Sequence, residues 1–475
     1  MTHFLAVVIG ILYVYTIVST ISVLLLENRN PAKSLSWLLV LLFLPVVGMF
    51  FYLLLGQDYR KTKIISQKSI RRVTDRPVAS FDISKLDRTL MDDNQLNLIK
   101  LLYRNSEAAG YAFNKIDVFS DGESTFNAIF DALKSAKDHI HIEFFIFDDD
   151  QISNQLRELL IRKVSEGVRV RMIYDYWGSF KLSKKYLKSL REAGVYVRPF
   201  LPFRWQISRS NKINYRNHRK LIVVDGEIGF TGGLNIADRY VYGNNLGEWR
   251  DTFIRLQGSA VHGLQLLFMI DWYFVDQKLV EGAQYFPEPQ KFDPNLVQIV
   301  NSGPDSDWSA ILQGIASAFT SATRYIYIHS PYFMPTDIIA ACIQIAALSG
   351  IDVRLMIPVK SDSSFSDASS SSYLGQALEA GVRVFRYKGG FLHSKAMVID
   401  DFISIVGSTN MDERSFAQNF EANAFIYDPK TAIELKELFL QDIESCEELT
   451  LEAWTGRKRR QKLKESFARL FSPLM

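Results

Sequence analysis

Cysteine is scarce in this sequence. Its 475 residues include only two, Cys342 and Cys446. Neither has another cysteine or a histidine nearby at the spacing of a zinc ligand set. We therefore expect both to be small buried apolar residues of a protein that resides in a reducing compartment.

A surplus of charge is also missing. Lys and Arg together number 55 and Asp and Glu 52, which leaves a formal net charge of +3. A protein that gains its affinity from the nucleic-acid backbone needs a larger positive surplus, so we expect no nucleic-acid partner, although local basic patches remain open. The length exceeds that of one ordinary domain and indicates two or three units.

Two long stretches near the N-terminus lack charged residues altogether. Residues 4–26 and 34–56 each run for 23 residues without a charge. At about 1.5 Å per residue, each helix would reach roughly 34 Å, enough to cross a hydrocarbon core of about 30 Å. We predict a transmembrane hairpin over residues 1–58. A cleaved signal peptide fits poorly because no basic segment precedes the first run, and two buried soluble helices are the alternative.

Basic residues predict the orientation of this hairpin. The turn between the two runs contains only two basic residues, Arg29 and Lys33. We interpret residues 59–110 as a basic juxtamembrane linker and helix, and this segment begins with six cations. Cytoplasmic flanks carry the excess of Lys and Arg, so the main body is expected in the cytoplasm. The six cations are Arg60, Lys61, Lys63, Lys68, Arg71 and Arg72.

The rest of the chain repeats itself at low similarity. The β-rich runs 139–147 and 325–333 each follow a helix-like stretch and precede a second strand, a helix and a Glu-Ala-Gly-Val string. Alternating strands and helices predict an α/β fold with a largely parallel or mixed sheet. We expect two similar lobes, residues 111–290 and 291–450, related by a pseudo-twofold, with a ligand site at their shared interface.

The most specific feature is a motif that occurs once in each half. It reads His-x-Lys, four residues, Asp, and an Asn lies 17 positions after each His in both copies. The first copy comprises His218, Lys220, Asp225 and Asn235, and the second comprises His393, Lys395, Asp400 and Asn410.

Each motif suits phosphate chemistry. A histidine and a lysine two apart on an extended segment point to the same face, so an imidazole lies beside an ammonium. Two such pairs brought together would hold one phosphodiester, with one imidazole as nucleophile and the other as acid. A metal site is disfavoured because each lysine would repel a divalent cation. Asp225 and Asp400 have the opposite strand parity and are expected to order the motif rather than touch the substrate.

Two basic segments contain aromatic residues. The first half has an insertion with Phe203, Arg204 and Trp205, and residues 451–475 form a basic amphipathic tail. Both patterns are typical of a membrane interface, where rings and cations meet headgroups. A loop packed on its own lobe is an equal alternative for the insertion, and a solvated charged tail is the alternative for the C-terminus.

The doubled motif resembles the phospholipase D superfamily, and nearly the whole chain is similar to the bacterial cardiolipin synthases. The similarity also includes the apolar double run, the string around Tyr215, the segment 330–335 and the segment 407–415. It implies transfer of a phosphatidyl group between two phosphatidylglycerol molecules at the bacterial cell membrane, in a multi-pass protein with its catalytic body on the cytoplasmic side. Neither a metal nor another cofactor is implied.

The resemblance also implies residue roles. His218 is the expected nucleophile and His393 the acid and base, while both lysines and both asparagines bind phosphoryl oxygens. Glu421, 28 positions after His393, is expected to orient a catalytic histidine. In the first half Glu248 and Asp251 stay open for that role.

Other interpretations remain for two residues and for the function. Glu143 and His329 occupy matching places in the β-rich runs and would face the site or form structural contacts. A phospholipase D-type hydrolase would share the chemistry up to the covalent intermediate. A membrane-anchored scaffold is the third interpretation, against which two intact motifs argue.

Overall fold

A computed structural model describes scattered helical residues between positions 4 and 22, residues 31–44, 47–49 and 52, and then residues 92–202 and 215–472. The chain forms two compact units. The first comprises Met1–Lys61 and Phe203–Asn214, and the second comprises Thr62–Pro202 and Tyr215–Met475.

In the first unit the main described element is helix α2 (Pro31–Phe43). Its Trp37 and Leu41 pack with Tyr52, and the rings of Trp37 and Tyr52 lie 5.4 Å apart. No helix among the described residues combines the length and the apolar character that crossing a bilayer requires. Large parts of the predicted runs 4–26 and 34–56, all of the basic segment 60–72 and most of the aromatic insertion lie outside the described residues.

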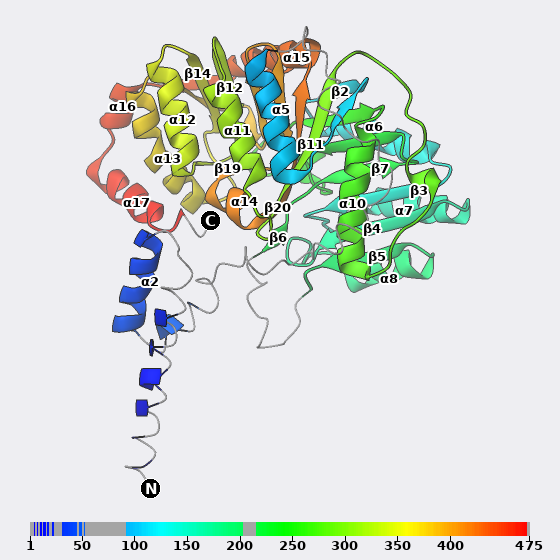
Figure 1. Ribbon diagram of the computed structural model, residues 1–475, viewed down its shortest axis with the longest axis horizontal. Helices are drawn as coiled ribbons and strands as arrows, with labels where there is room; N and C mark the ends of the chain where they lie inside the picture. Colours follow the sequence, from blue (N-terminus) through cyan, green and yellow to red (C-terminus); the bar gives the residue numbers. More distant parts are fainter. Residues whose placement is uncertain are drawn as a thin grey trace. The chain divides into compact units, whose positions relative to one another are not determined.

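The second unit contains two mixed sheets, which Figure 1 shows side by side. The first has seven strands in the order β2-β10-β8-β7-β3-β4-β5. The middle of the second has the order β11-β20-β18-β17-β12-β14-β15, with β1 and β21 at its edges. The first sheet consists of β2 (Lys115–Phe119), β3 (His139–Phe144), β4 (Arg169–Asp175), β5 (Tyr196–Phe200), β7 (Leu221–Val224), β8 (Ile228–Gly232) and β10 (Phe253–Gln257). The second consists of β1 (Gly110–Ala112), β11 (Leu296–Ser302), β12 (Tyr325–His329), β14 (Asp352–Pro358), β15 (Arg383–Tyr387), β17 (Ala396–Ile399), β18 (Ile403–Gly407), β20 (Asn419–Tyr427) and β21 (Cys446–Leu449).

The two sheets repeat one topology strand for strand. In each, a strand pairs in parallel with the next strand along the chain and antiparallel with the strand that follows the motif lysine. In each sheet three neighbouring strands are parallel and pair with antiparallel strands on one side, so the sheets are mixed. The α/β class and the internal repeat predicted from the sequence are therefore confirmed.

Helices cover both faces of each sheet. In the first lobe α6 (Gly122–Ser135), α7 (Gln151–Ser165) and α8 (Lys184–Glu192) pack on one face, and α10 (Val261–Asp276) packs on the other. Alternation along β3 follows from this, because Ile140 and Ile142 face the apolar core while His141 and Glu143 face α10.

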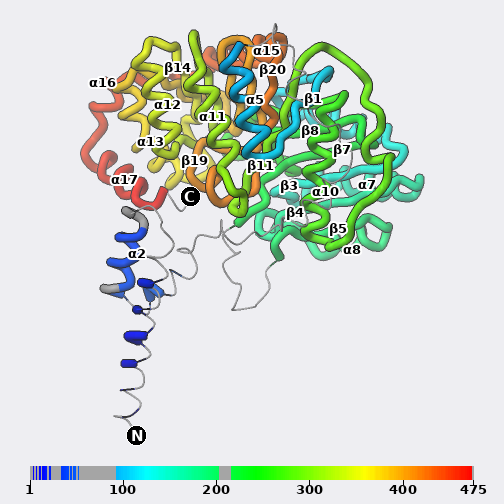
Figure 2. The backbone as a smooth tube through the Cα atoms, viewed as in Figure 1, coloured from blue at the N-terminus to red at the C-terminus, as the bar shows by residue number. Residues whose placement is uncertain are grey.

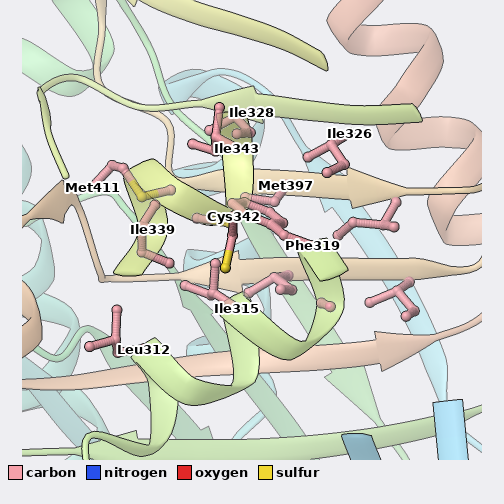
Figure 3. Packing of buried hydrophobic residues seen from close by; sticks show 14 of the residues in the cluster. Leu312, Ile315, Phe319, Ile326, Ile328, Ile339, Cys342, Ile343, Met397 and Met411 are labelled. Carbon is pink, nitrogen blue, oxygen red and sulfur yellow. The ribbon is translucent and has the colours of Figure 1, made fainter. Parts of the chain in front are cut away.

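The second lobe has the same layers. Its core lies between the sheet and helices α11 (Ala310–Thr320), α12 (Asp337–Leu348) and α13 (Ser364–Glu379), and α15 (Pro429–Ile443) covers the opposite face. Figure 3 shows Ile315 and Phe319 of α11 in the same buried cluster as Ile326 and Met397 of the sheet. Cys342 lies in this core, as expected, whereas Cys446 on β21 is only partly buried.

Helix α5 (Asp93–Ser106) lies far from α11 in the sequence but beside it in space (Figure 2). Its Leu98, Ile99 and Leu102 belong to the second core. Strand β1, which follows α5, pairs with β11 of the same lobe. The chain thus contributes to the second lobe before it builds the first.

Candidate active site

Each lobe contributes a short strand to the other lobe directly before its motif histidine. Strand β6 (Arg216–Asn217) pairs in parallel with the start of β20, and β16 (Gly390–Leu392) pairs in parallel with β9 (Glu248–Arg250). The next backbone N–H groups continue the exchange. That of His218 donates to Phe420 at 2.9 Å, and that of His393 donates to Arg250 at 2.8 Å. Both motifs therefore begin at the boundary between the lobes.

The carboxylates that orient the two imidazoles also cross this boundary. Nδ1 of His218 lies 3.0 Å from both oxygens of Glu421, which stands on β20 of the second lobe. Nδ1 of His393 lies 2.6 Å from Oδ2 of Asp251, which follows β9 of the first lobe. Each histidine is thus held through Nδ1 by the other lobe's carboxylate, and Nε2 of His393 lies 3.1 Å from Nζ of Lys395.

This geometry answers the question left open about the acidic partners. Glu421 contacts a motif histidine, but that histidine is His218 rather than the one in its own half. In the first half Asp251 has this position, whereas Glu248 is exposed. Sequence spacing pointed to Glu421 and left two candidates for its counterpart, because no local pattern records a contact between lobes.

The motif lysines lie beside their histidines, as the strand spacing predicts. Nζ of Lys220 donates to the carbonyl oxygen of His218 at 2.7 Å. Nζ of Lys395 lies 2.8 Å from Nδ1 of His393 and also donates to the His393 carbonyl. Both ammonium groups are buried. Burial lowers the pKa of Lys220 well below the ordinary value and that of Lys395 to about 8, against the opposing effects of Glu421 and Asp251. A bound phosphodiester would favour the charged form of both lysines.

Burial makes both imidazoles neutral near pH 7. It lowers the pKa of His218 to about 4 against the opposing effect of Glu421. It also lowers the pKa of His393 well below the ordinary value, and nearby Lys395, Lys220 and His218 add to that effect. The charge of one imidazole therefore acts on the other, which places both rings in one electrostatic environment. A neutral ring has the free lone pair that a nucleophile needs.

The two orienting carboxyls differ. Burial raises the pKa of Asp251 to about 6, against the lowering effect of Lys395. Burial would also raise the pKa of Glu421, but His218, Lys220 and the Ser408 hydroxyl together hold the pKa of that carboxyl below its ordinary value. Glu421 also accepts hydrogen bonds from Ser408 and, at 3.1 Å, from Asn419. The carboxyl on His218 is thus the more firmly ionised of the two.

The turn after each motif strand is fitted to the carboxylate it meets. A Cβ atom at Gly233 would lie 2.1 Å from Oδ1 of Asp251, so this position admits no side chain while the aspartate stays in place. The matching residue in the second lobe is Ser408, whose hydroxyl donates to Glu421. A glycine accommodates the aspartate, and a serine hydroxyl binds the glutamate.

This difference gives a matched pair of variants. We expect Gly233→Ala to displace Asp251 from His393 and to lower kcat about 100-fold, since small misplacements of catalytic groups cost about that much. Ser408→Ala places the same side chain at the equivalent position but removes only one hydrogen bond to Glu421, so it should retain most activity. Steady-state turnover, together with thermal unfolding of both variants, is the measurement, and equal losses of activity would contradict this assignment.

The two asparagines differ in their surroundings. Oδ1 of Asn235 accepts from the Ile146 N–H at 3.1 Å, and its Nδ2 donates to the Tyr240 hydroxyl at 2.6 Å. Tyr240 in turn faces the His393 ring at 5.6 Å. Oδ1 of Asn410 is buried without a hydrogen-bond partner among the described residues. Binding of phosphoryl oxygens by these amides stays a prediction.

The motif aspartates bind backbone instead of the motif. The Asp225 carboxylate accepts hydrogen bonds from three successive N–H groups, those of residues 137–139, at 2.7 to 2.8 Å. The Asp400 carboxylate accepts in the same way from residues 323–325. Each therefore fixes the corner where the chain enters the strand beside the motif. This arrangement supports the expected ordering role.

The two residues left open on the β-rich runs have structural partners. Glu143 is buried and accepts a hydrogen bond from Asn217, and burial together with nearby Asp271 raises its pKa well above the ordinary value. His329 lies 3.2 Å from Asp442, which pairs with Arg250 at 2.9 Å.

Sequence reasoning missed Arg219 inside the first motif. This buried guanidinium pairs with Asp271 of α10, and its Nε donates to the Glu421 carbonyl at 3.3 Å. The available signal was an arginine of opposite strand parity between His218 and Lys220, which must point behind the site. No group of three or more His, Cys, Asp and Glu side chains gathers as a metal site within the described part of the chain, and independence from metal stays a prediction.

Comparison with known proteins places this site in context. The family model described as "Cardiolipin synthase, PLD-like domain" matches residues 129–247 and 315–443, one motif in each match. The model described as "Phospholipase_D-nuclease N-terminal" matches residues 11–57.

Curated relatives match over nearly the whole chain. A cardiolipin synthase of Geobacillus sp. (strain WCH70) is 40% identical over 473 residues, covering 98% of this chain and 94% of the relative. The major cardiolipin synthase of Bacillus subtilis (strain 168) is 38% identical over 479 residues, covering 99% of each chain. The crystal structure of a phosphatidylserine synthase of Haemophilus influenzae Rd KW20 aligns with a TM-score of 0.61 at 14% identity, covering 80% of this chain and all of that one, and shares the fold.

Proposed function

Because this chain belongs to the cardiolipin synthase family, we propose that it transfers a phosphatidyl group from one phosphatidylglycerol molecule to another, releasing glycerol. The observation that carries the mechanism is that Glu421 and Asp251 each bind the motif histidine of the other lobe, which supports a site where two oriented imidazoles act on one phosphate. Two lysines beside them supply the positive charge that a phosphodiester requires.

In the first step Nε2 of His218 attacks the phosphorus of the first lipid. A nitrogen–phosphorus bond forms, and the bond from phosphorus to the glycerol oxygen breaks. His393, protonated once the anionic phosphate has raised its pKa, gives its proton to that oxygen, and glycerol leaves. We assign the nucleophile to His218 because its partner Glu421 is the more firmly ionised carboxylate and best stabilises the positive ring.

In the second step a glycerol hydroxyl of another phosphatidylglycerol attacks the phosphohistidine. His393, now neutral, takes the hydroxyl proton, and the bond between phosphorus and His218 breaks. The product is cardiolipin. His218 is neutral again, and His393 carries the proton that it had in the substrate complex, which it releases to solvent when the anionic product leaves. Lys220 and Lys395 hold the non-bridging oxygens throughout, where negative charge grows in the transition state.

Product analysis tests this function directly. The purified chain, supplied only with phosphatidylglycerol in detergent micelles, should yield cardiolipin and glycerol in equal amounts. A hydrolase would use water in the second step and yield phosphatidic acid and glycerol instead. Predominant phosphatidic acid at saturating lipid would reject the transferase and support the hydrolase.

Metal removal should leave the activity unchanged. In this mechanism lysines and histidines carry the positive charge at the phosphate, and a divalent cation would be repelled from their neighbourhood. We expect the same turnover before and after treatment with EDTA, with an active-site titration in both samples as control. Loss of turnover that a divalent ion restores would overturn this prediction.

We further propose that residues 1–58 form a membrane hairpin and that the catalytic body faces the cytoplasm of a bacterial cell. The charge-free runs and the match of residues 11–57 to a family N-terminal region support this. The segment before α5 would connect it to the lobes, since α5 and β1 already belong to the second lobe and not to a linker or to the first lobe as the division at residues 110 and 111 predicted. Residues 451–475 would form the basic tail. The reciprocal strand exchange supports a pseudo-twofold between the lobes.

Deletion of residues 1–58 should weaken membrane attachment more than chemistry. The reason is that every side chain assigned to catalysis lies between 218 and 421. The measurement is the membrane-bound fraction after high-salt washing, set beside turnover on detergent-dispersed phosphatidylglycerol. A truncated chain that keeps its fold but is inactive on dispersed lipid would show that the hairpin has a further role.

A further inference from the structure

Helix α17 (Arg459–Arg469) directs its apolar side chains away from the protein. Leu463 and Phe467 are 72% and 59% exposed, whereas Glu465 and Ala468 are 4% and 1% exposed. An amphipathic helix of a globular protein normally has the opposite arrangement. Since successive residues turn by about 100°, Leu463, Phe467 and the exposed Leu470 form one stripe opposite the packed side.

Polar contacts on the packed side fix this orientation. Glu465 pairs with Arg457 at 3.0 Å and accepts a hydrogen bond from Gln461 at 3.0 Å. Arg469 lies over the Tyr373 ring of α13, 4.3 Å from its centroid. Figure 1 shows α17 lying along α13. Turning the stripe inward would break these contacts and bury charge, so the apolar face is held outward.

The outward stripe continues onto α13. The rings of Phe467 and Phe471 lie 5.3 Å apart, and Phe471 meets Phe365 at 5.9 Å. Phe365, at the start of α13, is 37% exposed. We name the five apolar residues together the α17 patch; they are Phe365, Leu463, Phe467, Leu470 and Phe471.

One end of the α17 patch is near in sequence to a residue that acts on the active site. Asp362, three residues before Phe365, accepts a hydrogen bond from the Tyr332 hydroxyl at 2.7 Å. Its charge is one of those that act on the pKa of Lys395, the buried motif lysine. Phe365 is therefore three residues from a carboxylate whose charge reaches the motif lysine.

Charge identifies the occupant of this face. The eleven residues of α17 include five cations and a single carboxylate, Glu465, which Arg457 already neutralises. We propose that the α17 patch docks on the surface of an anionic bilayer, with its rings among the lipid chains and its cations at the phosphates. A second copy of the chain would bring five further cations against these five and is disfavoured. The identity of the lipid rests on the proposed function, because phosphatidylglycerol is anionic.

Nitroxide scanning of the full chain in vesicles tests the docking. Cys342→Ala and Cys446→Ser remove the native thiols, and single cysteines then replace Leu463, Phe467 or, as a matched control between them on the helix, exposed Ser466. Each labelled chain is reconstituted in vesicles of phosphatidylglycerol and phosphatidylethanolamine. Collision rates with oxygen and with a water-soluble nickel chelate report depth, and thermal unfolding checks the fold.

We expect labels at 463 and 467 to collide more with oxygen than with the chelate, at a depth of about 5–10 Å, and the label at 466 to show the reverse. Vesicles of phosphatidylcholine alone should reduce the contrast. Chelate access at 463 and 467 equal to that at 466 would overturn the proposal. Shielding from both reagents would also overturn it, since another protein surface would then cover the patch.

Repetition with His218→Asn separates this inference from the proposed function. Collision depth does not require turnover, so the depth pattern should persist in the inactive chain. Intact docking without cardiolipin formation in the wild-type preparation would reject the function alone. Cardiolipin formation with chelate-accessible labels would reject the docking alone.

Discussion

Replacement of His218 by asparagine should lower cardiolipin formation by roughly four orders of magnitude or more, as removal of a catalytic nucleophile does in other enzymes. Such a loss corresponds to about 5.5 kcal/mol of transition-state stabilisation. Asparagine keeps a polar side chain next to Glu421 but cannot form the covalent intermediate. The measurement is turnover with phosphatidylglycerol, together with trapping of labelled phosphoenzyme under an alkaline quench, because the nitrogen–phosphorus bond of a phosphohistidine is labile in acid.

His393→Asn provides the contrast that assigns the roles. A phosphatidyl ester of p-nitrophenol has a leaving group that departs without protonation, so the first step no longer needs the acid. We expect the His393→Asn chain to release about one equivalent of p-nitrophenol and then stop with phosphate on His218, because its base for the second step is missing. The His218→Asn chain should release none. A burst in the His218→Asn chain, with label on His393, would exchange the two assignments.

The second large effect concerns the polar cluster behind the first motif. We expect Arg219→Met to destabilise the fold by about 3–5 kcal/mol, because it leaves the buried Asp271 carboxylate without its cation. Glu143 lies in the same cluster, and its pKa is well above the ordinary value. The surroundings of Asp271 therefore already disfavour the ionised form of another carboxyl. The free energy of unfolding of the catalytic body, measured by denaturant titration, checks the prediction.

Two controls separate a buried-charge penalty from a simple loss of side-chain volume. Arg255→Met removes the partner of Asp117 at a pair that is more than one quarter exposed, where a salt bridge contributes up to about 1 kcal/mol. The double variant Arg219→Met, Asp271→Leu removes both charges and should recover most of the lost stability. Equal losses in the single and double variants would show that packing, and not the unpaired carboxylate, explains the effect.

The Arg219 cluster also links stability to geometry at the site. Asn217, which directly precedes His218, donates a hydrogen bond to the Glu143 carboxyl. Arg219, which directly follows His218, donates a hydrogen bond to the backbone carbonyl of Glu421. These contacts fix the chain on both sides of His218. In the second motif, Ser394 occupies the position that matches Arg219. The hydroxyl groups of Ser394 and Thr252 are hydrogen-bonded to each other at 2.6 Å. The two motifs therefore share their catalytic groups but differ in what holds them.

Sequence patterns determined a good part of this protein. The period of two along a strand placed each lysine beside its histidine and each motif aspartate on the opposite parity, because both relations arise within a few residues. The repeat of strands and helices predicted two similar α/β lobes, and the duplicated motif with its asparagine singled out His218 and His393 among seven histidines.

Tertiary structure alone decided the pairing across the lobes. Glu421 binds His218 at a separation of 203 residues, and Asp251 binds His393 at a separation of 142. No local periodicity encodes such contacts, since they depend on how β6 and β16 exchange between sheets. Tertiary structure also decided the orientation of α17. The sequence predicted that this segment is amphipathic, but its apolar side faces outward because of the ion pair of Glu465 and the packing of Arg469 against α13. The spacing of residues along one strand or helix can be predicted from the sequence. Which distant element packs against a given face is determined only by the tertiary structure.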